Sequence, residues 1–208
     1  MELKTAIWRH YAKPEELHMW KRPSHKFYIM KQLKLSLAIT VLYYLFCFAQ
    51  CKKSNPDSNG LPDATQDGKN TLGFLLNGQP WNPQGNNGTA NLSLYYDATI
   101  AGGGFNLAAY RIISTEVRQR LTMFGDSIQY PQRIILPNPN KFGAIFRNDV
   151  SGCDYDIADT IVKITGGYFD LKKLDKTNNI FSGEFEIKFK KAGCEDVQIS
   201  QGRFDMKY

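Results

Sequence analysis

Residues 180–190, IFSGEFEIKFK, decide the fold class because small or apolar residues alternate with polar ones along the whole stretch. The odd positions hold Phe181, Gly183, Phe185, Ile187 and Phe189. A period of two residues places successive side chains on opposite faces of a β-strand. We therefore predict an antiparallel strand with one face in a core and the other in water.

The segments on either side of this strand copy one another at an offset of 35 residues. Residues 162–172, VKITGGYFDLK, align with residues 197–207, VQISQGRFDMK, and six positions are identical. A repeat seen only twice indicates a duplicated strand motif and not a solenoid. The three segments are predicted to form a meander.

Each copy changes its apolar phase in the middle. Ile199 is apolar at an odd position, whereas Phe204 is apolar at an even one. A strand keeps one face buried across such a change only if it contains an extra residue. We expect that β-bulge at Gly202, and at Gly167 in the first copy.

The rest of residues 71–208 has the same character, and we predict one all-β domain. No stretch keeps an apolar period of 3.6 residues over three turns, and Gly, Pro, Asn and Asp separate short apolar runs. The further expected strands are residues 71–76, 91–97, 104–113, 118–128 and 141–147. This pattern predicts an antiparallel β-sandwich or a flattened, lipocalin-like barrel of about 8–10 strands that ends in the meander.

Residues 30–51, MKQLKLSLAITVLYYLFCFAQC, have the organisation of a secretory signal peptide. Two lysines precede a 14-residue apolar run (35–48), and a helix of that length covers about 21 Å of the ~30 Å hydrocarbon core. We interpret residues 1–29 as an upstream mis-called start or an extension, and residues 30–50 as the signal peptide.

The leader can end in two ways. Residues 48–51, FAQC, resemble a bacterial lipobox in which Cys51 is acylated, although Gln50 departs from the usual small residue. Cleavage after Ala49 would instead release a soluble secreted protein. We favour lipidation because residues 51–70 are polar and rich in Pro, Gly, Asn and Asp, as in a flexible tether.

Charge and histidine content restrict the function of the mature chain. Residues 1–50 hold 8 of the 26 Lys and Arg residues and 3 of the 20 Asp and Glu residues, which leaves a net charge of +1 from Cys51 onward. That balance argues against a nucleic-acid partner. All three histidines also precede Cys51, so Ser-His-Asp catalysis and His-ligated zinc are excluded for the mature chain. We predict no cofactor and no metal site.

Two cysteines remain in the expected domain, Cys153 and Cys194. In an oxidising compartment they are a candidate disulfide, and the alternative is two reduced thiols.

The sequence contains the motifs LPDATQDGKNTLG (61–73), Asn77-Gly78, Trp81 and ISQGRFD (199–205). Together these motifs resemble a family of small uncharacterised lipoproteins from Bacteroidota. The resemblance implies an exported, lipid-anchored all-β domain of the outer membrane and supplies no activity. Lys52 and Lys53 stand where surface-exported relatives tend to have acidic residues, which favours the periplasmic face.

Other polar and aromatic groups have alternative interpretations. Asp154, Asp156 and Asp159 lack the spacing of a calcium loop and are expected in a solvated turn. Glu184, Glu186 and their acidic neighbours on the meander suggest either a carboxylate-based glycan hydrolase or an ordinary solvated face.

Trp81, Tyr95 and Tyr110 are candidates for a ligand-facing surface, although aromatic residues also fill β cores. We therefore expect a non-catalytic binding or structural module whose partner is a glycan, a peptide or an envelope protein. We identify no catalytic residues for this module. The alternatives are the carboxylate-based hydrolase, whose catalytic groups would be the acidic residues of the meander, and a periplasmic assembly or inhibitor lipoprotein.

Overall fold

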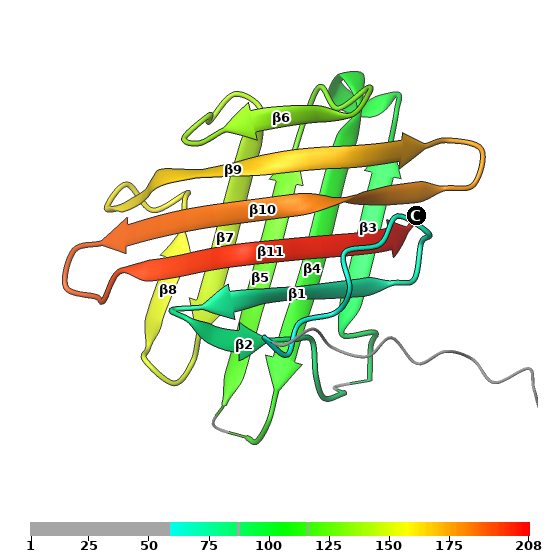
Figure 1. The fold of residues 1–208 in the computed structure, drawn as a ribbon. Coiled ribbons are helices and arrows are strands. Elements are labelled where there is room, and N and C mark those ends of the chain that lie inside the picture. The colour runs from blue at the N-terminus through cyan, green and yellow to red at the C-terminus, as the bar shows by residue number, and fades with distance from the viewer. Residues whose placement is uncertain (1–58, 87, 116) are drawn as a thin grey trace, which may run out of the picture. The chain divides into compact units, whose positions relative to one another are not determined.

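The computed structural model describes residues 59–208, apart from residues 87 and 116. The expected extension (1–29), signal peptide (30–50) and lipidation site at Cys51 lie outside the described residues. The described chain is built of two antiparallel sheets with six and five strands. In Figure 1 the strands of the six-stranded sheet run across the view, and those of the five-stranded sheet run steeply behind them.

The six-stranded sheet contains the predicted meander at its centre. In spatial order its strands are β2 (Gln79–Trp81), β1 (Thr71–Leu76), β11 (Val197–Lys207), β10 (Ile180–Lys191), β9 (Val162–Asp175) and β6 (Gln132–Ile135). β10 pairs with β9 on one side and with β11 on the other, so the meander prediction is confirmed.

The five-stranded sheet is built mainly from consecutive antiparallel strands. In spatial order these are β3 (Leu92–Asp97), β4 (Gly104–Ile112), β5 (Arg118–Gly125), β7 (Phe142–Asn148) and β8 (Cys153–Asp156). A short 3-10 turn, η1 (Ile100–Gly102), joins β3 to β4.

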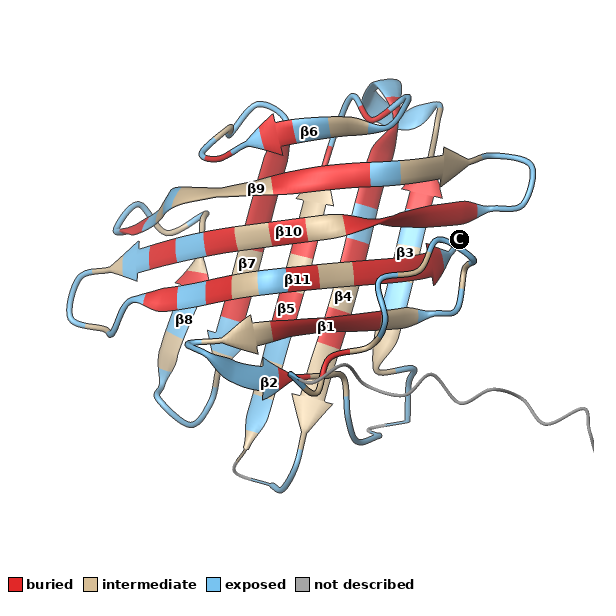
Figure 2. Ribbon diagram, in the orientation of Figure 1, coloured by how far each residue is buried: buried red, intermediate tan, exposed pale blue. Residues whose placement is uncertain are grey.

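The hydrophobic core lies between the two sheets and is dominated by phenylalanine. Inward-facing rings from both sheets meet there: Phe105 stacks on Phe169 at 5.0 Å between ring centroids, and Phe169 stacks on Phe204 at 5.5 Å. Burying such a side chain contributes about 1.5–3 kcal/mol. Figure 2 shows the resulting alternation of buried and exposed positions along the strands of the six-stranded sheet.

The duplicated motif occupies equivalent places on either side of β10. Phe169 and Phe204, which correspond in the repeat, are both in the core, as are Leu171 and Met206. The aspartates of the repeat, Asp170 and Asp205, are also both buried, at 7% and 1% exposure. Equivalent residues of the two copies are therefore buried in the same way on either side of the central strand β10.

Both copies contain the expected bulge. In β11 the register shifts between the pairs Phe185–Gly202 and Ile187–Ile199, and Gln201 has a positive φ of 51°. In β9 it shifts next to Gly166, and a β-carbon on Gly167 would lie 2.0 Å from a backbone carbonyl oxygen of β10. Glycine is required there because the neighbouring strand leaves no space for a side chain.

The sequence prediction differs from the structure at the domain's N-terminal edge. We expected a flexible tether up to residue 70, but Leu61 is fully buried, and four of the residues 65–69 (all except Gln66) donate hydrogen bonds to Asp205. The carboxylate of Asp205 accepts hydrogen bonds from the Thr65 hydroxyl and from three backbone amides. The second half of the expected tether is therefore part of the folded domain.

The all-β class and the sandwich are confirmed, and the described strands do not close into a barrel. The described residues contain eleven strands, close to the expected number of about 8–10. The strands that were missed are β2, β6 and β8, each of three or four residues. Segments so short cannot display a two-residue period.

Candidate functional site

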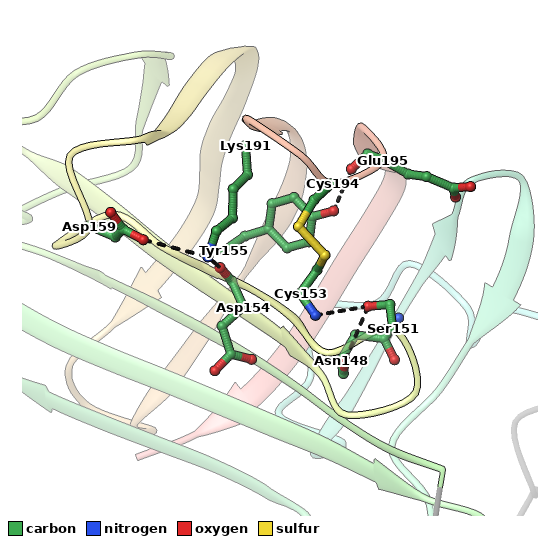
Figure 3. Close-up of a disulfide and its surroundings, with 9 residues drawn as sticks. All are labelled: Asn148, Ser151, Cys153, Asp154, Tyr155, Asp159, Lys191, Cys194 and Glu195. Carbon is green, nitrogen blue, oxygen red and sulfur yellow. Dashed lines mark hydrogen bonds and ion pairs between the residues drawn. A yellow bond between two sulfur atoms is a disulfide. The ribbon is translucent and has the colours of Figure 1, made fainter.

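One hollow lies at the end of the sandwich where Cys153 and Cys194 form a disulfide, which confirms that pairing (Figure 3). The bond joins β8 of the five-stranded sheet to the turn between β10 and β11 of the six-stranded sheet. The hollow beside it has a volume of about 310 Å³. Its apolar lining includes Leu76, Phe146 and Val197.

Most polar groups around this disulfide-end hollow are already bonded within the protein. Cys153 N donates to Ser151 Oγ, which donates in turn to the carbonyl of Asn148. The Tyr155 hydroxyl donates to the carbonyl of Glu195 (Figure 3). The disulfide and these bonds fix the walls of the hollow. They leave few polar groups to orient a ligand, which a specific binding pocket needs.

A second site lies on the outer face of the five-stranded sheet, where two hollows of about 270 and 210 Å³ adjoin. We call them the twin hollows because both are lined by Tyr110 of β4 and Arg120 of β5. Those two residues are direct partners in the β4–β5 ladder. Tyr110 is held in place by a 2.5 Å hydrogen bond from its hydroxyl to the carbonyl of Thr89.

The first of the twin hollows has a lining of small and hydroxylated residues. Besides Tyr110 and Arg120 it contains Thr89, Ala90, Ser93, Ala108 and Ala109. Ser93 and Ala108 are cross-strand partners of β3 and β4. Small side chains between a tyrosine and an arginine leave the shallow space that forms this hollow.

The second of the twin hollows is cationic. Its lining includes Arg118, Arg120, Arg147 and Asp149. Arg120 faces Arg147 directly across the β5–β7 ladder, and Arg118 lies two residues from Arg120 on the same face of β5. Sequence reasoning did not select Arg118 or Arg120. The signal was present, because pairing the strands expected at 104–113 and 118–128 brings Arg120 beside Tyr110.

The three aromatic residues expected to face a ligand are not brought together. Tyr110 lines the twin hollows, and Tyr95 is 56% exposed on edge strand β3 of the same sheet. Trp81 is fully buried, so its assignment as a ligand-facing residue is wrong. Its ring stacks on Phe74 at 4.5 Å, and its indole Nε1 donates to Gln119 at 2.8 Å.

The acidic residues of the meander lie on the outer face of the six-stranded sheet. Asp170 and Glu184 are partners across β9 and β10, and Lys172 Nζ lies 2.8 Å and 3.7 Å from their carboxylates. The hydrogen bond to Asp170 raises the pKa of Lys172 above its usual value. Glu184 and Glu186 line none of the three hollows described above.

The acidic residues 154–159 are ion-paired. Arg147 lies 4.0 Å from Asp154 and 3.6 Å from Asp156, and Lys191 lies 3.5 Å from Asp159. Asp154 and Asp156 belong to strand β8, so the turn expected for them is wrong. Within the part of the chain that the structure describes, no group of three or more potential metal ligands is found.

No protein-family model, curated protein or solved structure matches this chain. Among the described residues, no helix has the length and apolar character needed to cross a membrane. The twin hollows are therefore selected on their geometry and chemistry alone. They combine an aromatic side chain, hydroxyl groups and a local excess of positive charge on one face.

Proposed function

We propose that this protein is a non-catalytic ligand-binding module, held at the outer membrane by a lipid on Cys51, that binds its ligand in the twin hollows. The leader, Cys51 and the resemblance to Bacteroidota lipoproteins support the anchor. Lys52 and Lys53 favour the periplasmic face, and secretion after cleavage at Ala49 is the alternative.

The observation that carries this proposal is that the two hollows share Tyr110 and Arg120. A ligand that covers both hollows contacts one aromatic and one cationic side chain at its centre. Central aromatic and arginine residues supply much of the affinity in many interfaces. The ladder hydrogen bonds of β4 and β5 fix the backbone beneath them, so the site does not have to be ordered on binding.

The carboxylate-based hydrolase has weaker support. A hydrolase needs two carboxyl groups in a cleft with different roles, one of them a proton donor. Here Lys172 bridges Asp170 and Glu184 on the outer face of the six-stranded sheet. Glu184 and Glu186 line none of the three hollows described above, so none of these hollows is a cleft in which two carboxyl groups of the meander could flank a sugar.

The test is binding of the full-length chain to glycan and peptide arrays, repeated with two variants of the site. Tyr110→Ala removes the central ring, and Ser93→Trp fills the hollow between β3 and β4. We expect each to weaken binding of a recognised probe roughly tenfold.

Tyr130→Ala is the matched control, because Tyr130 is 63% exposed and lines neither of the twin hollows. It should leave the affinity unchanged. Absence of any probe that binds at millimolar concentration would contradict the proposal. So would a bound probe whose affinity neither Tyr110→Ala nor Ser93→Trp alters.

A further inference from the structure

The arginines of the twin hollows have different partners. Arg147 already contacts the carboxylates of Asp154 and Asp156 on β8. Across the described part of the chain, neither Arg118 nor Arg120 forms a salt bridge. Both side chains are exposed on the outer face of β5. Two guanidinium groups are therefore available to a ligand at the second hollow.

Arg120 lies beside another positive charge, Arg147, which Asp154 and Asp156 offset only in part because all three side chains are partly exposed. It lies opposite Arg147 in the β5–β7 ladder, and like charges directly opposite in a sheet are destabilising. The chain from Cys51 onward is nearly neutral, so this is a local concentration of charge. Apart from Asp149, no acidic residue lines either of the twin hollows. An anion bound between the arginines would relieve the repulsion.

We infer that the ligand of the twin hollows is an acidic glycan, with a carboxylate or sulfate group bound by Arg118 and Arg120 and a sugar ring against Tyr110. This inference rests on the proposed function, because it assigns the chemical class of ligand to the same site. A guanidinium group donates two parallel hydrogen bonds to such an oxyanion, which gives both affinity and orientation.

The surroundings favour a sugar chain over a peptide. Extended peptides commonly bind by adding a strand to an exposed sheet edge. Tyr110, Arg118, Arg120 and Arg147 belong to β4, β5 and β7, which are paired on both sides, so the backbone beneath these side chains is engaged in the sheet; only Ser93 comes from the edge strand β3. Besides Tyr110 and Arg120, the first hollow is lined only by small residues, Thr89, Ala90, Ser93, Ala108 and Ala109, and no large aliphatic side chain lines it.

The experiment measures binding of the full-length chain to four polymers at low and physiological ionic strength. Polygalacturonate carries carboxylates, heparin carries sulfates, dextran is neutral and poly-glutamate is an acidic peptide. We expect polygalacturonate or heparin to bind more tightly than dextran and poly-glutamate. Added salt should weaken that binding, because exposed charges are screened.

The paired substitution Arg118→Gln/Arg120→Gln should weaken acidic-glycan binding by at least about thirtyfold, because two charge-assisted contacts are lost. The matched control is Lys163→Gln/Lys188→Gln, which removes two exposed positive charges from the six-stranded sheet. It should change binding by less than about threefold at physiological ionic strength, since Lys163 and Lys188 belong to the other sheet and line neither of the twin hollows. Arg118→Lys/Arg120→Lys keeps the charge and should restore only part of the affinity.

The outcomes separate this inference from the proposed function. If dextran binds as well as the acidic glycans, with loss in Tyr110→Ala but not in the arginine variant, the site stands and the acidic class is wrong. Preferential binding of poly-glutamate would also overturn the glycan assignment. If no polymer binds, or if binding is insensitive to both Tyr110→Ala and the arginine variant, both the inference and the proposed function fail.

Discussion

Replacing Asp205 by alanine should detach the N-terminal segment from the domain. The Asp205 carboxylate accepts hydrogen bonds from Thr65 Oγ1 at 2.5 Å, from the Gly68 amide at 2.7 Å, and from the amides of Asp67 and Lys69 at 3.0 and 3.3 Å. These bonds hold residues 65–69 on the outer face of β11.

The expected cost follows from these bonds. A hydrogen bond to a charged group contributes about 1.5–3 kcal/mol. Asp67 and Lys69 are exposed and regain water when the carboxylate is removed, so we attribute the loss mainly to Thr65 and Gly68. We expect Asp205→Ala to lower the free energy of unfolding by about 4 kcal/mol, and the melting temperature by about 8–16 °C.

The repeat provides a matched control at Asp170, which occupies the same position in the first copy. Its carboxylate contacts Lys172 at 2.8 Å and Arg133 at 3.5 Å, and both cations are substantially exposed. Such pairs contribute little, so Asp170→Ala should cost about 1–2 kcal/mol.

The assay is thermal and chemical denaturation of both variants, with limited proteolysis of the folded state. Only Asp205→Ala should become sensitive to cleavage within residues 61–70. Equal destabilisation by the two substitutions, or a protected segment in Asp205→Ala, would refute this reasoning.

Three further predictions concern Asp205, the disulfide and Gly167. Burial raises the pKa of Asp205, but its hydrogen bonds outweigh this and hold the pKa below the usual value. The stabilisation from this group is therefore complete above about pH 4 and is lost as the pH falls through the lowered pKa, so Asp205→Asn should flatten the acid limb of the stability–pH curve. Cys153→Ala/Cys194→Ala removes the bond between two residues with a sequence separation of 41. In urea denaturation the free energy of unfolding should fall by about 4 kcal/mol. A decrease below about 1 kcal/mol would contradict this prediction. Gly167→Ala should lower the free energy of unfolding by about 2 kcal/mol or more in calorimetry, because φ is 118° and the new β-carbon meets a carbonyl of β10. Gly152→Ala is the control. Gly152 has a φ of 64° but lies in open space, so its substitution should lower the free energy of unfolding by less.

Much of the fold could be predicted because the longest strands carry their information locally. The alternation in residues 180–190 identified β10, and the repeat identified its two neighbours and the bulges. The strands that were not predicted, β2, β6 and β8, are too short to show an alternating pattern in the sequence. β8 has the sequence CDYD, and aspartate is depleted in strands, yet Tyr155 faces the core while its two acidic neighbours face Arg147.

Other features depended on contacts between distant parts of the chain. Residues 61–70 have the composition of a linker, and they are ordered by Asp205, about 140 positions away. Trp81 was a ligand-facing candidate because of its aromatic side chain, but it is the inward-facing residue of β2 and stacks on Phe74. The order of residues 61–70 and the burial of Trp81 cannot be predicted from the sequence without knowing that β1 pairs with β11 and with β2.

The candidate site was only partly predictable for the same reason. Tyr110 could be selected by its residue type, whereas arginines on a half-exposed strand usually indicate a solvated face. Arg118 and Arg120 gain significance only when the ladder places Arg120 between Tyr110 and Arg147. The hollow itself depends on Ser93 and Ala108, whose small size matters only because they are cross-strand partners.

The most direct test of the central claim is NMR titration of the full-length, isotope-labelled protein with oligogalacturonate. We predict that the largest amide shift changes lie on the outer face of β3, β4, β5 and β7, centred on Tyr110 and Arg120. Changes centred on the disulfide-end hollow or on Asp170 and Glu184 of the six-stranded sheet would contradict it, as would the absence of any change at millimolar concentration.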